Sequence, residues 1–277
     1  THVHIYAWSH GTYWAQRFLH VRTMDPETIS LDGVVSAPAC TILDWDPQTD
    51  TAGRYLLTLC GVDSWCSSLW GGNDPLVVMQ RLFDEIRKNS NASCLSKVKH
   101  ASQPYDNFIQ SLLAGLIGDM QLRLLIPPTL LKLIRCNEDD VAALEHLISV
   151  IPPGSAIAGI PDLPVQYNQM ASELTQMDLA VQPSFQPYKA ADKKLFLSTH
   201  AVESWIEQLW NEWPRYSPDK FWRSTPDFGT IPTLLLQGDL DPYTPFSYAT
   251  LLYHELTVDQ GHSKTVQFAK MSLCSHG

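Results

Sequence analysis

The sequence predicts an α/β fold in which a large helical insertion interrupts a largely parallel sheet. Strand and helix patterns alternate at the amino-terminal end of the chain and again at the carboxyl-terminal end, as in parallel sheets. Strand patterns disappear from the long interval between these ends, where helical patterns dominate. We therefore expect sheet-forming core over residues 1–40 and 230–277, and a helical cap or lid insertion over residues 41–229.

The amino-terminal end contains two predicted strands with a helix between them. Residues 3–8 form a short apolar run, and a helical pattern through Leu19 follows at once. A second apolar run covers residues 29–35, although Asp32 and Gly33 interrupt it. Such runs are typical of strands in a largely buried parallel sheet.

The carboxyl-terminal end repeats this alternation. Residues 232–237 and 264–270 predict strands, and a helix is expected between them from about Phe246 to Leu256. A chain that returns to the strand pattern after a long interval can complete the same sheet, so both ends are assigned to one core.

Within the insertion, capping residues mark the starts of helices. Asp74 precedes a proline and Asn137 precedes three acidic residues, which suit the positive end of a helix. The most apolar region, residues 108–134, predicts a buried helical hairpin, because its charged residues and paired prolines exclude an uninterrupted membrane span. A further helix is expected from about His200 to Trp213.

Composition limits the classes of protein to which this chain can belong. Of its 277 residues 44% are hydrophobic and 17% are charged, which suits a globular protein with a sizeable core. The formal net charge is -10 and the sequence pI is about 5.4. Because nucleic-acid sites need clustered Lys and Arg, and none is present, a nucleic-acid partner is not expected.

Cysteine spacing and one short motif favour an oxidising compartment. Cys60 and Cys66 close a short loop, for which we predict a disulfide, and Asn91-Ala92-Ser93 is an N-glycosylation acceptor sequence. These features predict a secreted protein or one of the secretory pathway. The sequence leaves open the partners of the other cysteines, which are Cys40, Cys94, Cys136 and Cys274.

The turn after the first predicted strand carries a candidate nucleophile, Ser9. The sequence Ala7-Trp8-Ser9-His10-Gly11 lies between a strand and a helix, which is where a nucleophile elbow occurs. Small residues flank the serine because the turn is tight, and side chains there are expected to clash. Considered alone, the motif would favour a serine that caps a helix, and it is the strand before it and the helix after it that favour the nucleophile.

The candidate acid follows the strand at residues 232–237. Two carboxylates compete in this loop, and Asp241 is favoured because the chain has left the strand and can turn its side chain towards an imidazole. Asp239 is expected to cap or orient the turn. Taken alone, the loop would be a solvated turn rich in Asp and Pro.

The candidate base is His276, with His262 as the alternative. In the α/β-hydrolase order of Ser, Asp and His, the base follows the final strand, and only His276 lies after residues 264–270. Ser9 would then attack a carbonyl carbon, His276 would carry its proton, and Asp241 would fix the imidazole tautomer. The peptide N–H of His10 would supply one oxyanion donor.

Taken together, these motifs resemble the tripeptidyl and prolyl aminopeptidase-like serine peptidases of the α/β-hydrolase superfamily. The residues that carry the resemblance are Ser9 to Tyr13 with Ala15 to Arg17, Leu31 to Val35, Cys60 to Cys66, and Thr233 to Pro245. The resemblance implies a secreted exopeptidase that removes residues from peptide N-termini without a metal or cofactor. Ala7 departs from the usual glycine of the elbow.

The resemblance also implies missing strands and a substrate anchor. Since Thr1 lies just before the elbow, the N-terminal strands of the core and the second oxyanion donor would be absent, and we expect an associating fragment of poor activity. Glu203 is a candidate anchor for the substrate ammonium, or else an exposed helix residue. The alternatives are a lipase or esterase, favoured by the apolar stretch 112–134, and a non-catalytic fragment.

Overall fold

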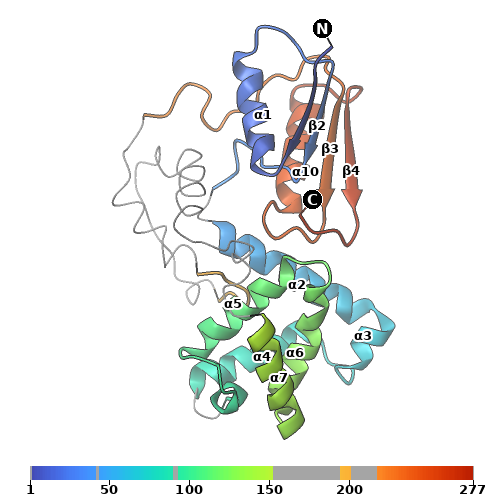
Figure 1. Cartoon of the computed structure of the whole chain (residues 1–277). Coiled ribbons are helices and arrows are strands. Elements are labelled where there is room, and N and C mark those ends of the chain that lie inside the picture. The colour runs from blue at the N-terminus through green and yellow to red at the C-terminus, as the bar shows by residue number, and fades with distance from the viewer. Residues whose placement is uncertain (1, 42–43, 90–92, 152–193, 201–216, 277) are drawn as a thin grey trace. The chain divides into compact units, whose positions relative to one another are not determined.

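The computed structural model describes residues 2–41, 44–89, 93–151, 194–200 and 217–276 (Figure 1). They belong to two compact units. The sheet unit comprises the described residues up to Asp44 together with 217–276, and the helical unit comprises 45–89, 93–151 and 194–200. The mixed α/β class predicted from the sequence is confirmed.

The sheet unit is built on four parallel strands in the order β1-β2-β3-β4 (Figure 1). They are β1 (His4–Trp8), β2 (Thr28–Asp32), β3 (Thr233–Gly238) and β4 (Val266–Met271). The register pairs Ala7 with Leu31 and Leu31 with Leu235. Strands from the two ends of the chain therefore share one sheet.

The second strand is shorter than the sequence predicted. It ends at Asp32 instead of reaching Val35, because Gly33 adopts a left-handed conformation with φ +62°. The N–H of Val34 then donates to the side chain of Gln237 at 2.7 Å, so the chain has left the backbone ladder.

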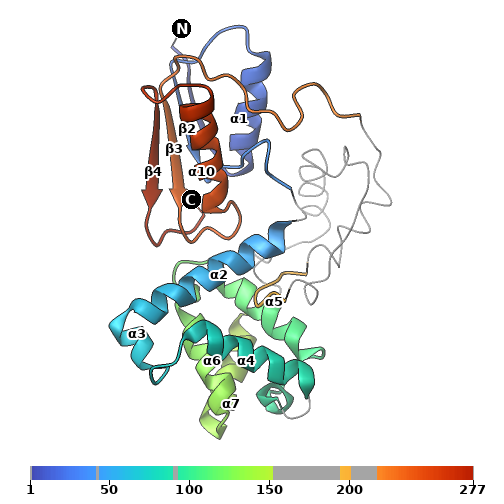
Figure 2. The same ribbon diagram turned by 180° about the vertical axis from the view of Figure 1, so that it is seen from behind.

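One face of the sheet packs against two helices, α1 (His10–Val21) and α10 (Phe246–His254). The latter continues as a π-helical turn, η7 (Glu255–Asp259), and can be followed along the sheet in Figure 2. A single hydrophobic cluster contains residues of both helices and of all four strands, including Leu19, Leu31, Leu235, Leu252 and Val266. Burial of this apolar surface stabilises the sheet unit.

The alternate side chains of β1 point to the opposite face and are exposed. Tyr6 is 66% exposed and Trp8 is 52% exposed, whereas Ala7 between them is buried. The expectation of a largely buried strand is therefore wrong for the opposite face of β1, since these side chains alternate with a period of two.

The helical unit contains helices that begin at the two capping residues predicted from the sequence. Asp74 caps α4 by accepting from the N–H of Leu76, and Asn137 forms a capping box with Asp140 at the start of α7, so both predicted helix starts are confirmed. The elements are α2 (Trp45–Val62), α3 (Ser64–Ser68), α4 (Pro75–Lys88), η3 (Cys94–Lys97), α5 (Tyr105–Ile117), η4 (Leu122–Leu125), α6 (Ile126–Arg135) and α7 (Glu138–Val150).

The apolar region 108–134 forms α5, η4 and most of α6, as predicted for a buried hairpin. Its fully buried members include Leu113, Leu116 and Leu130. Among the described residues, no helix combines the length and the hydropathy that crossing a bilayer requires.

Two buried carboxylates of α2 hold the short segment 194–200. Asp50 accepts from the N–H groups of Phe196 and Leu197, at 2.7 and 3.0 Å. Asp46 accepts from the N–H and hydroxyl of Thr199, and burial raises the pKa of Asp46 although these bonds oppose the shift. The predicted helix from His200 to Trp213 lies, beyond its first residue, outside the described residues.

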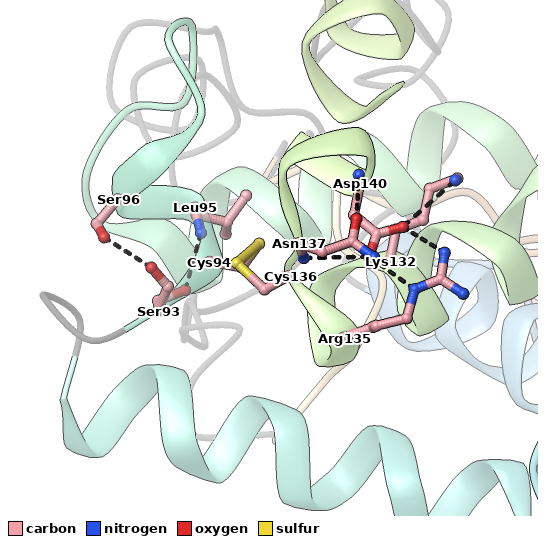
Figure 3. Close-up of a disulfide and its surroundings, with 9 residues drawn as sticks. All are labelled: Ser93, Cys94, Leu95, Ser96, Lys132, Arg135, Cys136, Asn137 and Asp140. Carbon is pink, nitrogen blue, oxygen red and sulfur yellow. Dashed lines mark hydrogen bonds and ion pairs between the residues drawn. A yellow bond between two sulfur atoms is a disulfide. The ribbon is translucent and has the colours of Figure 1, made fainter. Parts of the chain in front are cut away.

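Two disulfides lie in the helical unit. The predicted bridge between Cys60 and Cys66 is confirmed, with Cα atoms 5.0 Å apart. A second bridge joins Cys94 at the start of η3 to Cys136 directly after α6 (Figure 3), with Cα atoms 5.6 Å apart. The sequence left this second pairing open, because its cysteines are 42 positions apart.

Candidate active site

Ser9 lies at the sharp turn between β1 and α1. Its backbone has φ 55° and ψ -129°, a positive φ that is uncommon for residues other than glycine. The N–H of Ser9 donates to the carbonyl of Asp32 at 2.8 Å, and its carbonyl accepts from Thr12. Its side chain makes no capping bond, although the residue occupies the N-cap position of α1. The Ser9 hydroxyl is therefore not used to cap α1.

The small residues around Ser9 are less constrained than the sequence suggested. A Cβ added at Gly11 would lie 3.9 Å from the Cβ of Ala7, which is ordinary van der Waals contact. The expectation that a side chain at Gly11 must clash is therefore wrong for a methyl group.

Asp241 follows β3 and is almost fully buried, with 3% of its surface exposed. Its Oδ1 accepts from the N–H groups of Tyr243 and Thr244, both at 2.8 Å. Its Oδ2 accepts from the Thr244 hydroxyl at 2.7 Å, from Gln237 Nε2 at 3.1 Å and from His276 Nδ1 at 2.8 Å. Hydrogen bonds from three segments of the chain thus offset the cost of burying the Asp241 carboxylate.

The competing carboxylate, Asp239, has a different role in the loop. Its Oδ1 accepts from the N–H of Leu273 at 2.7 Å, and its Oδ2 lies 3.0 Å from Lys270 Nζ. Asp239 therefore holds the turn that follows β4, the segment that leads to His276, whereas the sequence had assigned it to the turn after β3.

His276 lies in that segment, and its ring contacts Asp241. A carboxylate can only accept, so Nδ1 of a neutral ring carries the proton and Nε2 keeps a free lone pair. His262 instead bonds Asp227 at 3.0 Å, before the start of β4. Of the two candidate bases, the structure places only His276 beside Asp241.

Besides Asp241, the imidazole of His276 contacts the Thr244 hydroxyl, which lies 3.2 Å from Nδ1, and it packs against Trp8, Tyr243 and Gly33. The rings of Trp8 and Tyr243 lie with centroids 5.3 and 5.4 Å from it. A Cβ added at Gly33 would lie 3.0 Å from His276 Cε1, so the ring rests against the bare backbone of Gly33. Packing against Trp8 puts the imidazole beside the residue that precedes Ser9.

Of the three candidate residues, Asp241 and His276 are in direct contact, and Ser9 is linked to them through its neighbour Trp8. Asp241 and His276 share a hydrogen bond, and Ser9 lies next to a residue that contacts the His276 ring. Ser9 Oγ and the imidazole, both in described parts of the chain, are not hydrogen-bonded to each other. Nucleophile–base bonds are often long in the absence of substrate and tighten when it binds.

The candidate oxyanion donor belongs to the first residue of α1, His10. A helix N-terminus carries partial positive charge and favours a developing anion nearby. The His10 side chain stacks on Tyr13, with ring centroids 5.8 Å apart.

Sequence reasoning missed four residues that position the acid and the base. Gln237 and Thr244 bond Asp241, Gly33 packs on His276, and a Cβ at Gly238 would overlap the carbonyl oxygens of Cys274 and Ser275. The available signal was the presence of glycine directly after a strand at Gly33 and at the end of one at Gly238, where close backbone approach is common.

The candidate substrate anchor, Glu203, lies outside the described residues. The comparisons with protein-family models and with curated proteins found no match to this chain.

Proposed function

We propose that this protein is a serine hydrolase of the α/β-hydrolase type, with Ser9 as nucleophile, His276 as base and Asp241 as acid. The observation that carries the proposal is the Asp241–His276 hydrogen bond of 2.8 Å, in which the acid is buried and the imidazole is partly buried. It is supported by the positive φ of Ser9 at a strand-to-helix turn of the same sheet.

In the proposed reaction, Ser9 Oγ attacks a carbonyl carbon as His276 Nε2 takes its proton. The peptide N–H of His10 donates to the resulting oxyanion. The imidazolium then returns the proton to the leaving group, which departs and leaves an acyl-enzyme on Ser9. Water deacylates this intermediate with the same base, and Asp241 stabilises imidazolium in both halves of the cycle.

For the substrate we propose a peptide with a free N-terminus, cleaved without a metal or cofactor. The support is the run of motifs that resemble the aminopeptidase-like enzymes, above all Thr233 to Pro245, which contains Asp241. The two disulfides are consistent with the proposed secretory location, where they would remain oxidised.

The esterase alternative is the second candidate, and the apolar stretch on which it depends is only partly exposed. It depended on the apolar stretch 112–134 as an acyl-binding surface, yet most of its large apolar side chains are buried within the helical unit, including Leu112, Leu116, Ile126 and Leu133. Side chains that fill a core are not available to a substrate, but Met120, Leu124, Leu125 and Ile134 of the same stretch are exposed. Turnover of acyl esters against aminoacyl-anilides therefore decides between the two candidates.

The test is covalent labelling of Ser9 by a fluorophosphonate, followed by turnover of aminoacyl-anilides and short acyl esters. We expect labelling of the wild type that Ser9→Ala abolishes. Asp241→Asn should lower kcat by about 10⁴-fold, because the imidazole then adopts the wrong tautomer.

The matched control is His262→Ala against His276→Ala. The first should retain labelling, since within the described ranges the His262 ring bonds Asp227 and not Asp241. Absence of labelling at Ser9 in a folded wild type, or labelling that survives His276→Ala but not His262→Ala, would refute the proposal.

The substrate assignment makes a separate prediction for Glu203. If this side chain pairs with the substrate ammonium, Glu203→Gln should lower kcat/KM for free-amine peptides by about tenfold or more. N-blocked esters should be hardly affected. Equal losses on both substrates would leave Glu203 a structural residue.

A further inference from the structure

Gln237, at the end of β3, is fully buried and joins three segments of the sheet unit. Its Oε1 accepts from the N–H of Val34 at 2.7 Å, in the loop after β2. Its Nε2 donates to the carbonyl of Thr244 at 2.6 Å and to Asp241 Oδ2 at 3.1 Å. The side-chain amide therefore lies between the loop after β2 and the loop that carries the acid.

Only an amide satisfies all of these contacts. The N–H of Val34 requires an acceptor, while the Thr244 carbonyl and the Asp241 carboxylate require donors. A glutamate of the same shape has no donor when ionised, and an apolar side chain has neither function. Either replacement would leave buried polar groups without a hydrogen-bond partner.

We propose that Gln237 is a positioning residue that fixes the Asp241 carboxylate for His276, an inference that rests on the proposed function. The oxygen that receives Gln237 Nε2 is the one that accepts from His276 Nδ1. The amide thus sets the plane of the carboxylate and, through Val34, ties it to the loop whose Gly33 supports the imidazole.

The substitution Gln237→Glu would place a second carboxylate beside Asp241. Two carboxylates at hydrogen-bond distance repel each other, and additional negative charge near an imidazole favours its protonated form. We therefore expect the acid limb of the kcat/KM profile to move to higher pH by about one unit. Gln237→Met, which adds no charge, should lower kcat by about tenfold or more, leaving KM within about twofold and the acid limb in place.

Gln16 offers the matched control in the same unit. It is equally buried, accepts from the N–H of Ala37 and donates to the carbonyls of Thr12 and Val35, but it contacts neither Asp241 nor His276. Gln16→Glu adds the same charge and loses comparable bonds. It should lower stability and leave the acid limb of kcat/KM in place.

The experiment measures kcat, KM and the pH profile for wild type, both Gln237 variants and Gln16→Glu, with rates divided by the fraction of Ser9 that a fluorophosphonate labels. This normalisation removes losses caused by unfolded protein. Gln237→Met with wild-type kcat per labelled site would overturn the proposal, and so would an acid limb that stays in place in Gln237→Glu while the introduced carboxyl is ionised.

A second readout needs no turnover. It distinguishes failure of the proposed role of Gln237 from failure of the proposed hydrolase function. The ring signals of His276, followed by NMR as the pH is varied, should titrate at higher pH in Gln237→Glu than in wild type or Gln16→Glu. A wild type that is not labelled refutes the hydrolase proposal alone. Identical titration of His276 in all three proteins, at a pH where the introduced carboxyl is ionised, refutes the role of Gln237. If Gln237→Glu does not fold, the test of Gln237 is the kcat of Gln237→Met per labelled site.

Discussion

At Gly33 the backbone itself forms part of the candidate site. The residue has φ +62° and the His276 ring packs where a side chain would begin. Two separate requirements therefore coincide at one position, a left-handed conformation and open space.

These requirements predict the effect of Gly33→Ala. The new Cβ would lie 3.0 Å from His276 Cε1 and 3.3 Å from the Thr244 hydroxyl, so the imidazole must shift. We expect a fall of about threefold in the rate at which Ser9 is labelled, since the imidazole must give by a few tenths of an ångström and a displacement of about 1 Å can cost about 100-fold.

The control for Gly33→Ala is Gly261→Ala. Gly261 has φ +77°, and a Cβ there would meet nothing within 4 Å. Both variants should lose about 1 kcal/mol of stability through backbone strain. Equal labelling rates in the two variants would show that contact with His276 does not matter.

Among the elements, α7 is notable for the carboxylate in its first turn, Asp140 (Figure 3). Asp140 is fully buried and completes the capping box with Asn137. It also accepts hydrogen bonds from the Arg135 guanidinium, and Lys132 Nζ lies 3.6 Å away. The side chain thus links the end of α6 to the start of α7.

This pairing predicts a pH-dependent contribution to stability. The hydrogen bonds from Arg135 lower the pKa of Asp140 from its usual 3.8 to about 2. Because the folded state favours the ionised form, the stabilisation is complete well above pH 3.8 and is lost as the pH falls through about 2.

The measurement is thermal unfolding of wild type and Asp140→Asn between pH 7 and about pH 2. We expect the variant to unfold at lower temperature at pH 7 and the difference to shrink as the pH falls through this window. Asp139→Asn, in the same turn of α7, serves as control and should show a smaller difference. A difference for Asp140→Asn that does not change with pH would contradict the assignment.

At the scale of the whole molecule, the candidate site and the disulfides belong to different units. Ser9, Asp241 and His276 lie in the sheet unit, while both disulfides lie in the helical unit. Chemical reduction should therefore act first on the helical unit.

The two disulfides should contribute unequally to the free energy of unfolding. Chain entropy alone gives roughly 4 kcal/mol for a bridge with the Cys94–Cys136 separation of 42 and roughly 2 kcal/mol for the Cys60–Cys66 separation of 6. We expect replacement of the Cys94–Cys136 pair by serine to destabilise the chain more than replacement of the Cys60–Cys66 pair.

Hydrogen exchange can locate these effects. Loss of the Cys94–Cys136 bridge should increase amide exchange in α5, α6 and α7 more than in the four strands. Uniform acceleration in both units would show that they unfold as one, contrary to this expectation.

Local patterns were sufficient to predict much of the fold. Apolar runs and their spacing predicted four strands, capping residues predicted the starts of α4 and α7, and a separation of six predicted the Cys60–Cys66 bridge. The choice of His276 over His262 as the residue beside Asp241 also followed from chain order. Each of these inferences depends on residues close in sequence or on the order of elements.

Contacts between distant residues were decided only by the tertiary structure. Val34 and Gln237 are 203 positions apart, yet their hydrogen bond connects the loop after β2 to the acid loop. The pairing of Cys94 with Cys136 and the packing of His276 on Gly33 are of the same kind. No local pattern encodes such contacts, because they exist only after the sheet has brought its strand ends together and the helices have buried their apolar faces.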